Sequence, residues 1–330
     1  MQERPEKLKS KVNMNEFSLI NRFFKSIPQR RDDVIFGIGD DAACLRLPPE
    51  KDLVISCDTL VADIHFVADW DAYNIAYKAV MANVSDIAAM GGTPGWLTLA
   101  LTLPAVDEVW LGRFAKGLGD AMSQFNLALI GGDTTKGPLS MTIGIHGTVP
   151  QNKAVRRSGA KPGDFIFVSG PLGAAAQAVA LLDNNDVDVN HKNSLMDALL
   201  YPKPRIDLNR YLLQYASSAI DISDGLAADL NHILEQSQVG ACLFWDSIPV
   251  HPLLELYQGK KAVEFAIKGG DDYELCLTVP AAQKPDFIKA LNDGGLSCFP
   301  IGMIEQQQGL RARLNNGEIK IINPGGYSHF

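Results

Sequence analysis

A chain of 330 residues with a formal net charge of −8 and 46% hydrophobic residues has the composition of an ordinary globular protein. Because this length exceeds what one hydrophobic core usually serves, two domains are expected. The negative charge disfavours nucleic acid and anionic membranes as partners. No apolar run is long enough to span a bilayer, and the charged first residues lack the apolar core of a secretion signal, so we expect a cytoplasmic protein.

The spacing of apolar residues predicts the elements of the first half. Residues 1–13 are charged and aperiodic, and we expect a disordered extension there; helical spacing begins at Phe17. An apolar stripe predicts a helix that ends at the glycine pair 91–92. Alternation of apolar with small or polar residues over 97–103 and 139–145 predicts two strands, each with one buried face.

A segment dense in glycine and charge, residues 156–164, predicts a domain boundary near residue 150. We therefore expect an N-terminal domain over 14–150 and a C-terminal α/β domain over 151–330. Strands interleaved with helices indicate a mixed α/β fold. The five cysteines contain no C-x-x-C pair, so neither a disulfide framework nor a zinc site is expected.

Carboxylates adjoin glycine or small residues at six separated places. The six stretches are 39–41, 56–59, 83–86, 131–135, 221–225 and 269–272. If the fold gathers these carboxylates, their repulsion requires hard cations between them, and Mg²⁺ held by carboxylate and water usually carries phosphates. The pattern therefore indicates metal-assisted phosphate chemistry. A single Asp-Gly pair would indicate only a turn, and for 131–135 a plain turn is the alternative interpretation.

Two of these stretches follow apolar runs. The run 127–130 predicts a buried strand that delivers a flexible glycine pair and Asp133 to a ligand. In the other, a strand end projects Asp221 and Ser223 to one side, while Ser223 or Asp224 caps the helix that follows. A capping role and a ligand role are compatible, and capping alone is the alternative.

Two further observations concern polar residues and missing motifs. Asn83 and Asp86 share a helix face that meets either a metal or solvent. His65 follows Asp58 and is a candidate for contacting a phosphate or a polar substrate group, with a purely structural role as the alternative. The chain contains no G-x-x-x-x-G-K-[ST], no kinase H-R-D or D-F-G set and no G-x-S-x-G. A P-loop enzyme or a protein-kinase fold is therefore not supported, and serine-hydrolase chemistry is left without a nucleophile.

The ordered series GIGDDAA, DTL, HF, NVSDIAAMG, GGDTT, RSGAKPGD, IDISDGL and GGDDYELC closely resembles the thiamine-monophosphate kinase family, from about Met14 to the end of the chain. That family is similar to the aminoimidazole ribonucleotide synthetase superfamily, whose members pair through N-terminal strands into a shared barrel. The resemblance implies a two-domain fold of that type, in which the N-terminal domain over 14–150 binds ATP and Mg²⁺ and forms the homodimer. It also implies ATP chemistry in a cleft between subunits and domains.

The resemblance also implies an activity: ATP-dependent phosphorylation of thiamine monophosphate to thiamine diphosphate, by direct in-line transfer and with several Mg²⁺ ions. Metal-binding positions are matched by Asp41, Ser56, Cys57, Asp58, Asp86, Asp133, Asp221 and Asp224. ATP-contacting positions are matched by Gly132, Asp133, Arg157 and Ser223, and substrate positions by His65, Asp271 and Tyr327. Asp133 and Asp224 are expected to be catalytic through bound metal.

Three departures and two alternatives qualify this resemblance. Cys57 stands where the family often has Thr, Asp271 stands where Glu is common, and residues 173–175 replace a frequent Gly-Asp-Ser, so no side-chain ligand is expected there. Another superfamily member is the enzymatic alternative, but the chain lacks the N-terminal reactive cysteine of selenophosphate synthetases and the terminal cysteine of the hydrogenase-maturation protein. A non-catalytic nucleotide and metal sensor is the alternative from a different class.

Overall fold

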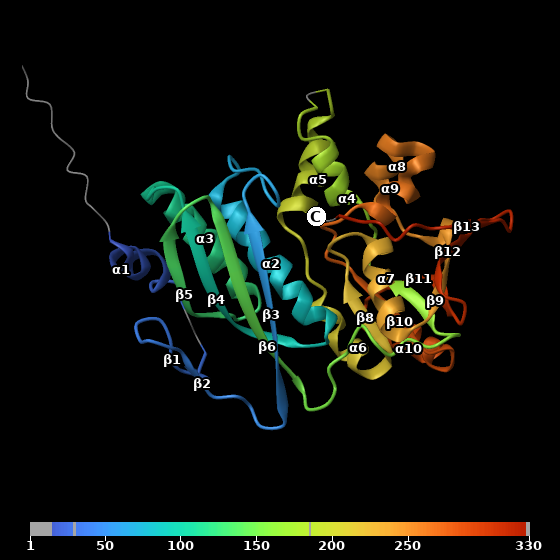
Figure 1. The fold of residues 1–330 in the computed structure, drawn as a ribbon, viewed down its shortest axis with the longest axis horizontal. Helices are drawn as coiled ribbons and strands as arrows, with labels where there is room; N and C mark the ends of the chain where they lie inside the picture. Colours follow the sequence, from blue (N-terminus) through green and yellow to red (C-terminus); the bar gives the residue numbers. More distant parts are fainter. Residues whose placement is uncertain (1–14, 29–30, 185, 328–330) are drawn as a thin grey trace, which may run out of the picture.

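The structure of the protein is a computed structural model that describes residues 15–28, 31–184 and 186–327. The expected disordered extension, residues 1–13, lies outside the described residues. The described chain forms two halves, each built on its own β-sheet and covered by helices (Figure 1). The mixed α/β class predicted from the sequence is therefore confirmed, while the domain boundary near residue 150 stays a prediction.

The N-terminal half is built on a four-stranded sheet of order β3-β6-β4-β5, so β3 and β5 are its edge strands. β4 pairs with β5 in parallel, and the other two pairs are antiparallel. In chain order the half contains α1 (Glu16–Leu19), a π-helical turn (Ile20–Phe24), β1 (Val34–Phe36), β2 (Cys44–Leu45), β3 (Lys51–Val61), α2 (Ala72–Ala89), β4 (Thr93–Leu103), α3 (Glu108–Gln124), β5 (Ala128–Lys136) and β6 (Ser140–Pro150).

Alternation of side chains builds the core of this half. From Leu97 onward in β4, and throughout β6, every second residue is buried, and the apolar residues among them share one core cluster with the apolar faces of α2 and α3. Helix α2 ends at Ala89, and Gly91 follows with a φ of +68°, a conformation that glycine adopts without strain. The two predicted strands and the predicted helix end are confirmed.

The C-terminal half is built on a seven-stranded sheet of order β13-β12-β9-β11-β7-β10-β8, in which only the pair β9 and β12 is parallel among the described strands. Short 3₁₀ turns link several of its elements. In chain order the half contains β7 (Phe165–Val168), α4 (Ala174–Ala180), α5 (Val189–Leu200), α6 (Asn209–Tyr215), β8 (Ser218–Asp221), α7 (Leu226–Ser237), β9 (Gly240–Phe244), α8 (Pro252–Gln258), α9 (Ala262–Lys268), β10 (Leu275–Val279), α10 (Lys284–Asp293), β11 (Phe299–Glu305), β12 (Gly309–Arg313) and β13 (Ile319–Ile321).

Both faces of the C-terminal sheet are covered, which explains its nearly continuous apolar strands. On β7, Ile166 and Val168 join a core cluster with α7, α8 and α9, while Phe167 between them joins a cluster with α6 and α10 on the other face. Strand β10 is buried along its whole length for the same reason.

Helix α2 is the element that connects the halves. It packs on the N-terminal sheet and also contacts β8, α5 and the turn over Ile206–Leu208 of the C-terminal half, as Figure 1 shows. The residues that α2 turns toward the C-terminal half are therefore placed to build a site shared by both halves.

Three expectations about assembly and environment stand as follows. The described strands close no barrel, and the shared barrel across a dimer stays a prediction. Among the described helices, none combines the length and apolar character that crossing a bilayer requires, and the cytoplasmic location stays a prediction. All five cysteines are free thiols.

Candidate active site

A cavity of about 800 Å³ is lined by residues of both halves, and we call it the inter-half cavity. Strand β3 and helix α2 supply its N-terminal wall, and the segments that follow β8 and α9 supply much of the opposite wall. The structure brings eleven of the residues singled out in the sequence to this cavity: Ser56, Cys57, Asp58, His65, Asp86, Arg157, Asp221, Ser223, Asp224, Asp271 and Tyr327.

Helix α2 presents Lys78, Ala82 and Asp86 to the cavity, because residues four apart share a helix face. The carboxylate of Asp86 accepts a hydrogen bond of 2.5 Å from the Ser56 hydroxyl on β3. Asn83, by contrast, is fully buried, and its amide nitrogen donates to the carbonyl of Ala79. The prediction that Asn83 and Asp86 meet one metal or one solvated surface is therefore wrong, since Asn83 turns into the core.

The segment after β8 has a different helix cap from the one the sequence indicated. The carboxylate of Asp229, inside the first turn of α7, accepts hydrogen bonds of 3.0 to 3.1 Å from the backbone N–H groups of Ser223, Asp224 and Gly225. The N-cap residue itself is Gly225, with a φ of +112°. The prediction that Ser223 or Asp224 caps the helix is wrong, and both side chains line the cavity instead.

Four carboxylates form the electrostatic centre of the cavity, and we call them the carboxylate cluster: Asp58, Asp86, Asp221 and Asp224. Burial, together with the charges of Asp86 and Asp224, raises the pKa of Asp58 to about 6. Burial and the charge of Asp86 raise the pKa of Asp221 to about 8. Burial also raises the pKa of Asp86, although the Ser56 hydroxyl and Arg157 oppose this shift. These carboxylates disfavour one another's ionisation, so a nearby cation would be strongly favoured.

The cluster fits a particular kind of metal binding. As placed, no three His, Cys, Asp or Glu side chains in the described part of the chain form a closed cage for one ion. Mg²⁺ seldom uses such a cage; it keeps several waters and takes one or two carboxylates together with phosphate oxygens. Buried, mutually repelling carboxylates beside a hydroxyl are the hard oxygen donors that this mode requires.

Other predicted residues line the same cavity as the carboxylate cluster. The Nδ1 atom of His65 accepts a hydrogen bond of 3.1 Å from the backbone N–H of Val61, which fixes the ring at the end of β3. Tyr327 is about half exposed, and its backbone N–H donates to the carbonyl of Asp224. Cys57 is exposed between its two neighbours on β3.

Three predicted residues lie elsewhere. Asp41, Gly132 and Asp133 line a second cavity of about 540 Å³, the edge cavity, beside β5 on the opposite edge of the N-terminal sheet from β3. Gly132 has a φ of +153°, and a Cβ there would lie 1.9 Å from the carbonyl oxygen of Leu99 on β4, so only glycine fits this close strand pairing. One chain therefore does not bring Asp133 to the carboxylate cluster.

Sequence reasoning missed two residues of the inter-half cavity, Lys78 and Tyr273. Lys78 is almost fully buried, and its ammonium nitrogen lies 3.1 Å from a carboxylate oxygen of Asp271. The Tyr273 hydroxyl donates a hydrogen bond of 2.9 Å to the other oxygen of Asp271. The signal for Lys78 was present, since it is a lone charge in the apolar run of residues 75–82, two helical turns before Asp86.

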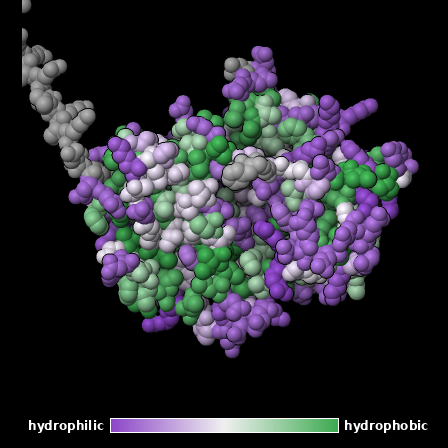
Figure 2. Space-filling model, in the orientation of Figure 1, coloured by the Kyte–Doolittle hydropathy of each residue, from purple (hydrophilic) through white to green (hydrophobic). Residues whose placement is uncertain are grey.

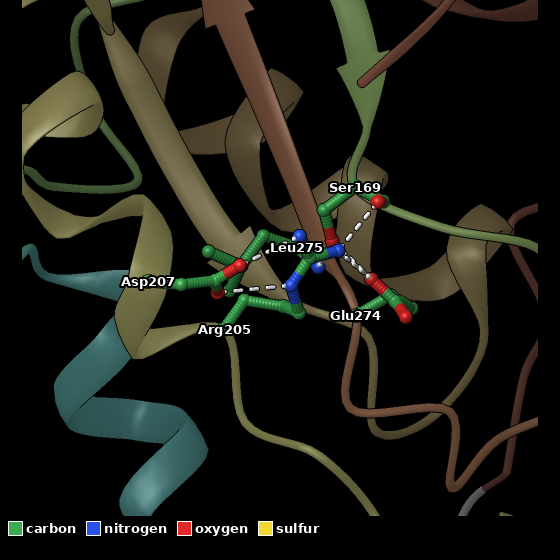
Figure 3. Close-up of polar contacts among 5 residues, drawn as sticks. All are labelled: Ser169, Arg205, Asp207, Glu274 and Leu275. Atoms are coloured by element: carbon green, nitrogen blue, oxygen red, sulfur yellow. Dashed lines mark hydrogen bonds and ion pairs between the residues drawn. The ribbon is translucent and has the colours of Figure 1, made fainter. Parts of the chain in front are cut away.

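A second polar network supports the loop that carries Asp271 (Figure 3). The guanidinium of Arg205 donates to the Ser169 carbonyl and to the Glu274 carboxylate, and it also pairs with both oxygens of Asp207. The Ser169 hydroxyl donates to Glu274 and accepts from the backbone N–H of Leu275. Burial opposes protonation of Arg205, but its two carboxylate partners hold the pKa of the guanidinium above its ordinary value. The network anchors the start of β10 just after the loop.

Comparison with known proteins gives consistent results along the chain. Residues 39–149 match the N-terminal domain of AIR synthase related proteins, and residues 161–315 match the C-terminal domain of the same family. The chain is 46% identical to the thiamine-monophosphate kinase of Escherichia coli (strain K12), over 96% of this chain and 98% of that protein. It is 32% identical to the thiamine-monophosphate kinase of Bacillus subtilis (strain 168), over 96% of this chain and 100% of that protein.

Solved structures are similar over comparable lengths. The crystal structure of thiamine-monophosphate kinase from Stenotrophomonas maltophilia K279a is 41% identical, with a TM-score of 0.81, and the match covers 88% of this chain and 93% of that one. The structure described as "AaThiL complexed with AMPPCP and TMP" is 30% identical, with a TM-score of 0.77, and the match covers 96% of this chain and 97% of that one.

Proposed function

Because the chain belongs to the thiamine-monophosphate kinase family of AIR synthase related proteins, we propose that it transfers the γ-phosphoryl group of ATP to thiamine monophosphate, giving thiamine diphosphate. The resemblance drawn from the sequence is thus confirmed at the level of the family, and the chain is a thiamine-phosphate kinase. The observation that carries the proposal is the carboxylate cluster in a cavity lined by both halves.

The acceptor needs no general base. A phosphate monoester has a second pKa near ~6, so its oxygen is largely ionised at neutral pH. The obstacle is the approach of two anionic molecules to each other and to a carboxylate-rich wall. We therefore infer direct in-line transfer from ATP to the acceptor, with no phosphorylated enzyme on the way. The enzyme contributes mainly positioning and electrostatic stabilisation.

The residues that would hold metal are the carboxylate cluster together with Ser56 and Cys57. When bound, Mg²⁺ supplies the positive charge that neutralises phosphate oxygens and carboxylates together. The protein itself supplies the guanidinium of Arg157 and the side chain of Ser223. The charge of Arg157 acts on Asp86, and Arg157 also borders an adjoining cavity together with Ser158. We assign Arg157 and Ser223 to ATP.

We assign the acceptor to the residues of the inter-half cavity that match substrate positions. His65, Asp271 and Tyr327 line the inter-half cavity together with the indole of Trp70. Thiamine monophosphate carries a cationic thiazolium and an aminopyrimidine, so an acidic wall with aromatic side chains is a suitable surface for it. The phosphate of the acceptor then faces the carboxylate cluster and any bound cations.

We further propose a homodimer, because Asp41, Gly132 and Asp133 lie on the far edge of the N-terminal sheet. On the face of the molecule drawn in Figure 2, hydrophobic side chains gather over the N-terminal half. Ile55 on the edge strand β3 is 60% exposed. Pairing of two such sheets would cover this apolar surface and complete a shared barrel. It would also bring Asp133 of the partner subunit to the inter-half cavity.

The test is an assay for ADP release coupled to detection of thiamine diphosphate. We expect one ADP for each thiamine diphosphate with thiamine monophosphate as acceptor, and no turnover when unphosphorylated thiamine replaces it. An isotopically chiral γ-phosphorus should undergo inversion, as a single in-line displacement requires. Absence of thiamine diphosphate formation would contradict the proposed activity, and retention at phosphorus would contradict direct transfer.

A further inference from the structure

Lys78 occupies an unusual place for a lysine. It belongs to α2 in the N-terminal half, yet its ammonium group ends beneath the loop that follows α9 in the C-terminal half. Only 2% of its side chain is exposed, and the ammonium donates a hydrogen bond of 3.1 Å to the carbonyl of Leu199 at the end of α5. Burying an ammonium is costly unless it is paired, so this placement requires a compensating partner.

The partner is Asp271, and its surroundings show how firmly it is held. Lys78 contacts one carboxylate oxygen at 3.1 Å, the Tyr273 hydroxyl donates to the other at 2.9 Å, and the Asp271 backbone N–H donates to the carbonyl of Ser223 at 2.8 Å. Asp271 and Tyr273 both adopt positive φ values, 66° and 51°, which cost energy for residues other than glycine. The contacts around Asp271 keep this strained loop in place.

The pair faces the same cavity as the carboxylate cluster. Lys78 lies on the same face of α2 as Asp86, but its ion-pair partner is Asp271, whose side chain remains 34% exposed on the cavity wall. The ring of Tyr273 lies 5.5 Å from the ammonium and completes the group. Carboxylate lone pairs not taken by Lys78 and Tyr273 are thus available to a ligand in the cavity.

Resting on the proposed function, we propose that Lys78 is a positioning residue for the acceptor. It fixes the Asp271 carboxylate so that the remaining lone pairs meet the cationic ring system of thiamine monophosphate. Because Lys78 reaches Asp271 from the helix that also carries Asp86, it sets the distance between the acceptor ring and the phosphate-binding end of the cavity. Its loss should therefore weaken acceptor binding far more than ATP binding.

The experiment compares four variants by steady-state kinetics with each substrate varied in turn. Lys78→Met should raise the KM for thiamine monophosphate by roughly tenfold or more, since it leaves a carboxylate unpaired and mobile, while the KM for ATP changes less than about twofold. Lys78→Arg should restore part of the loss. Asp271→Asn should resemble Lys78→Met, and the double variant should be no worse than the worse single variant, because contacting residues act as a unit.

Two controls keep the result interpretable. Lys320→Met removes a partly exposed lysine that pairs with Glu264 and is not among the residues that line the inter-half cavity, and it should change neither KM. Thermal melting measures whether each variant is folded. If Lys78→Met alone unfolds, the double variant Lys78→Met with Asp271→Asn provides a folded form that lacks the buried charge pair.

Each outcome has a defined meaning. Equal increases in both KM values, or additive losses in the double variant, overturn the role of Lys78 while the wild-type assay still supports the kinase activity. A wild-type enzyme that neither binds nor phosphorylates thiamine monophosphate overturns both proposals. A selective loss of acceptor affinity that Lys78→Arg partly restores supports the positioning role.

Discussion

The inter-half cavity and the edge cavity place similar motifs in different physical settings. In the inter-half cavity, acids from both halves are buried together, and burial with mutual repulsion raises the pKa values of Asp58 and Asp221. In the edge cavity, Asp41 and Asp133 are exposed and come from the N-terminal half alone. A single chain therefore assembles the charged centre of the site but leaves two of its expected acids in water.

This difference separates two kinds of dependence. The inter-half cavity requires cations because buried carboxylates of a single chain already repel one another there. The edge cavity can take part in catalysis only if another protein surface covers it. Phosphoryl transfer requires charge compensation on all sides of the reacting group. The proposed role of Asp133 therefore depends on dimer assembly, whereas that of Asp224 depends on the binding of cations.

The largest expected effect is on turnover, and it tests whether both cavities serve one reaction. Asp224→Ala and Asp133→Ala should each lower kcat by roughly 100-fold or more, because each removes a carboxylate assigned to hold the cations that neutralise the phosphate groups. Thermal melting should show both variants folded, since neither side chain is part of a core cluster. Near-normal kcat in Asp133→Ala would remove the edge cavity from the active site and leave the inter-half cavity unaffected.

Mixing these two variants sharpens the comparison further. If Asp133 acts across a dimer interface, a mixed dimer of the two variants contains one site with both acids intact. Co-expression in equal amounts should then restore about a quarter of wild-type activity, since half of the dimers are mixed and each has one working site. Activity no higher than that of the separate variants would place both acids in the same subunit's site, or Asp133 in none.

How much of this arrangement the sequence predicted depends on the range of the interactions. Alternation over 97–103 and the glycine stop after α2 are local signals, and both predictions are confirmed. The prediction that Ser223 or Asp224 caps the helix failed because Asp229, which follows them by six and five residues, accepts hydrogen bonds from their backbone N–H groups. A side chain further along the sequence therefore holds this turn in place of the two residues nearest to the helix start.

The separation of the two cavities could not be predicted from chain order. Strands β3 and β5 form opposite edges of the N-terminal sheet, and β6, the last strand of that sheet in sequence, lies between β3 and β4. No local pattern encodes that order. The role of Lys78 likewise could not be predicted locally, because its ion-pair partner Asp271 lies almost two hundred positions later in the chain. Motifs predicted the residue types of the site, and sheet topology decided which of them meet.

A pH-dependent measurement tests the electrostatic cost in the inter-half cavity. The pKa of Asp221 is raised by burial and by Asp86 to about 8, so the folded state keeps its proton while the unfolded state releases it above about pH 4. Stability from this group is therefore greatest at low pH and is lost as pH rises from about 4 to about 8. Asp221→Asn removes that loss.

We expect the melting temperature of Asp221→Asn to exceed that of the wild type by several degrees at pH 8 with a chelator present, and by much less at pH 5. Asp183→Asn, at an exposed position, is the matched control and should follow the wild type at both pH values. Added Mg²⁺ should stabilise the wild type more than Asp221→Asn. A difference that is constant with pH would contradict the assigned burial and repulsion.

The smallest expected effect is a change in stability, and it concerns the polar network of Figure 3. This network holds the start of β10, just after the loop that carries Asp271. Glu274→Gln keeps the shape of the side chain but removes the charge that pairs with Arg205 at 2.9 Å and accepts from Ser169. Because Arg205 keeps Asp207 as a second partner, the loss should be limited to about 2 kcal/mol, a fall of a few degrees in melting temperature. Glu318→Gln, at an exposed position, should leave the melting temperature unchanged.

The kinetic consequence of Glu274→Gln separates support from direct positioning. Arg205 and Ser169 hold the start of β10, whereas Lys78 contacts Asp271 itself, so the KM for thiamine monophosphate should rise less in Glu274→Gln than in Lys78→Met. Steady-state kinetics below the melting transition measure this ranking. A larger KM increase in Glu274→Gln would mean that the loop is positioned from the C-terminal half, and that contact with α2 is secondary.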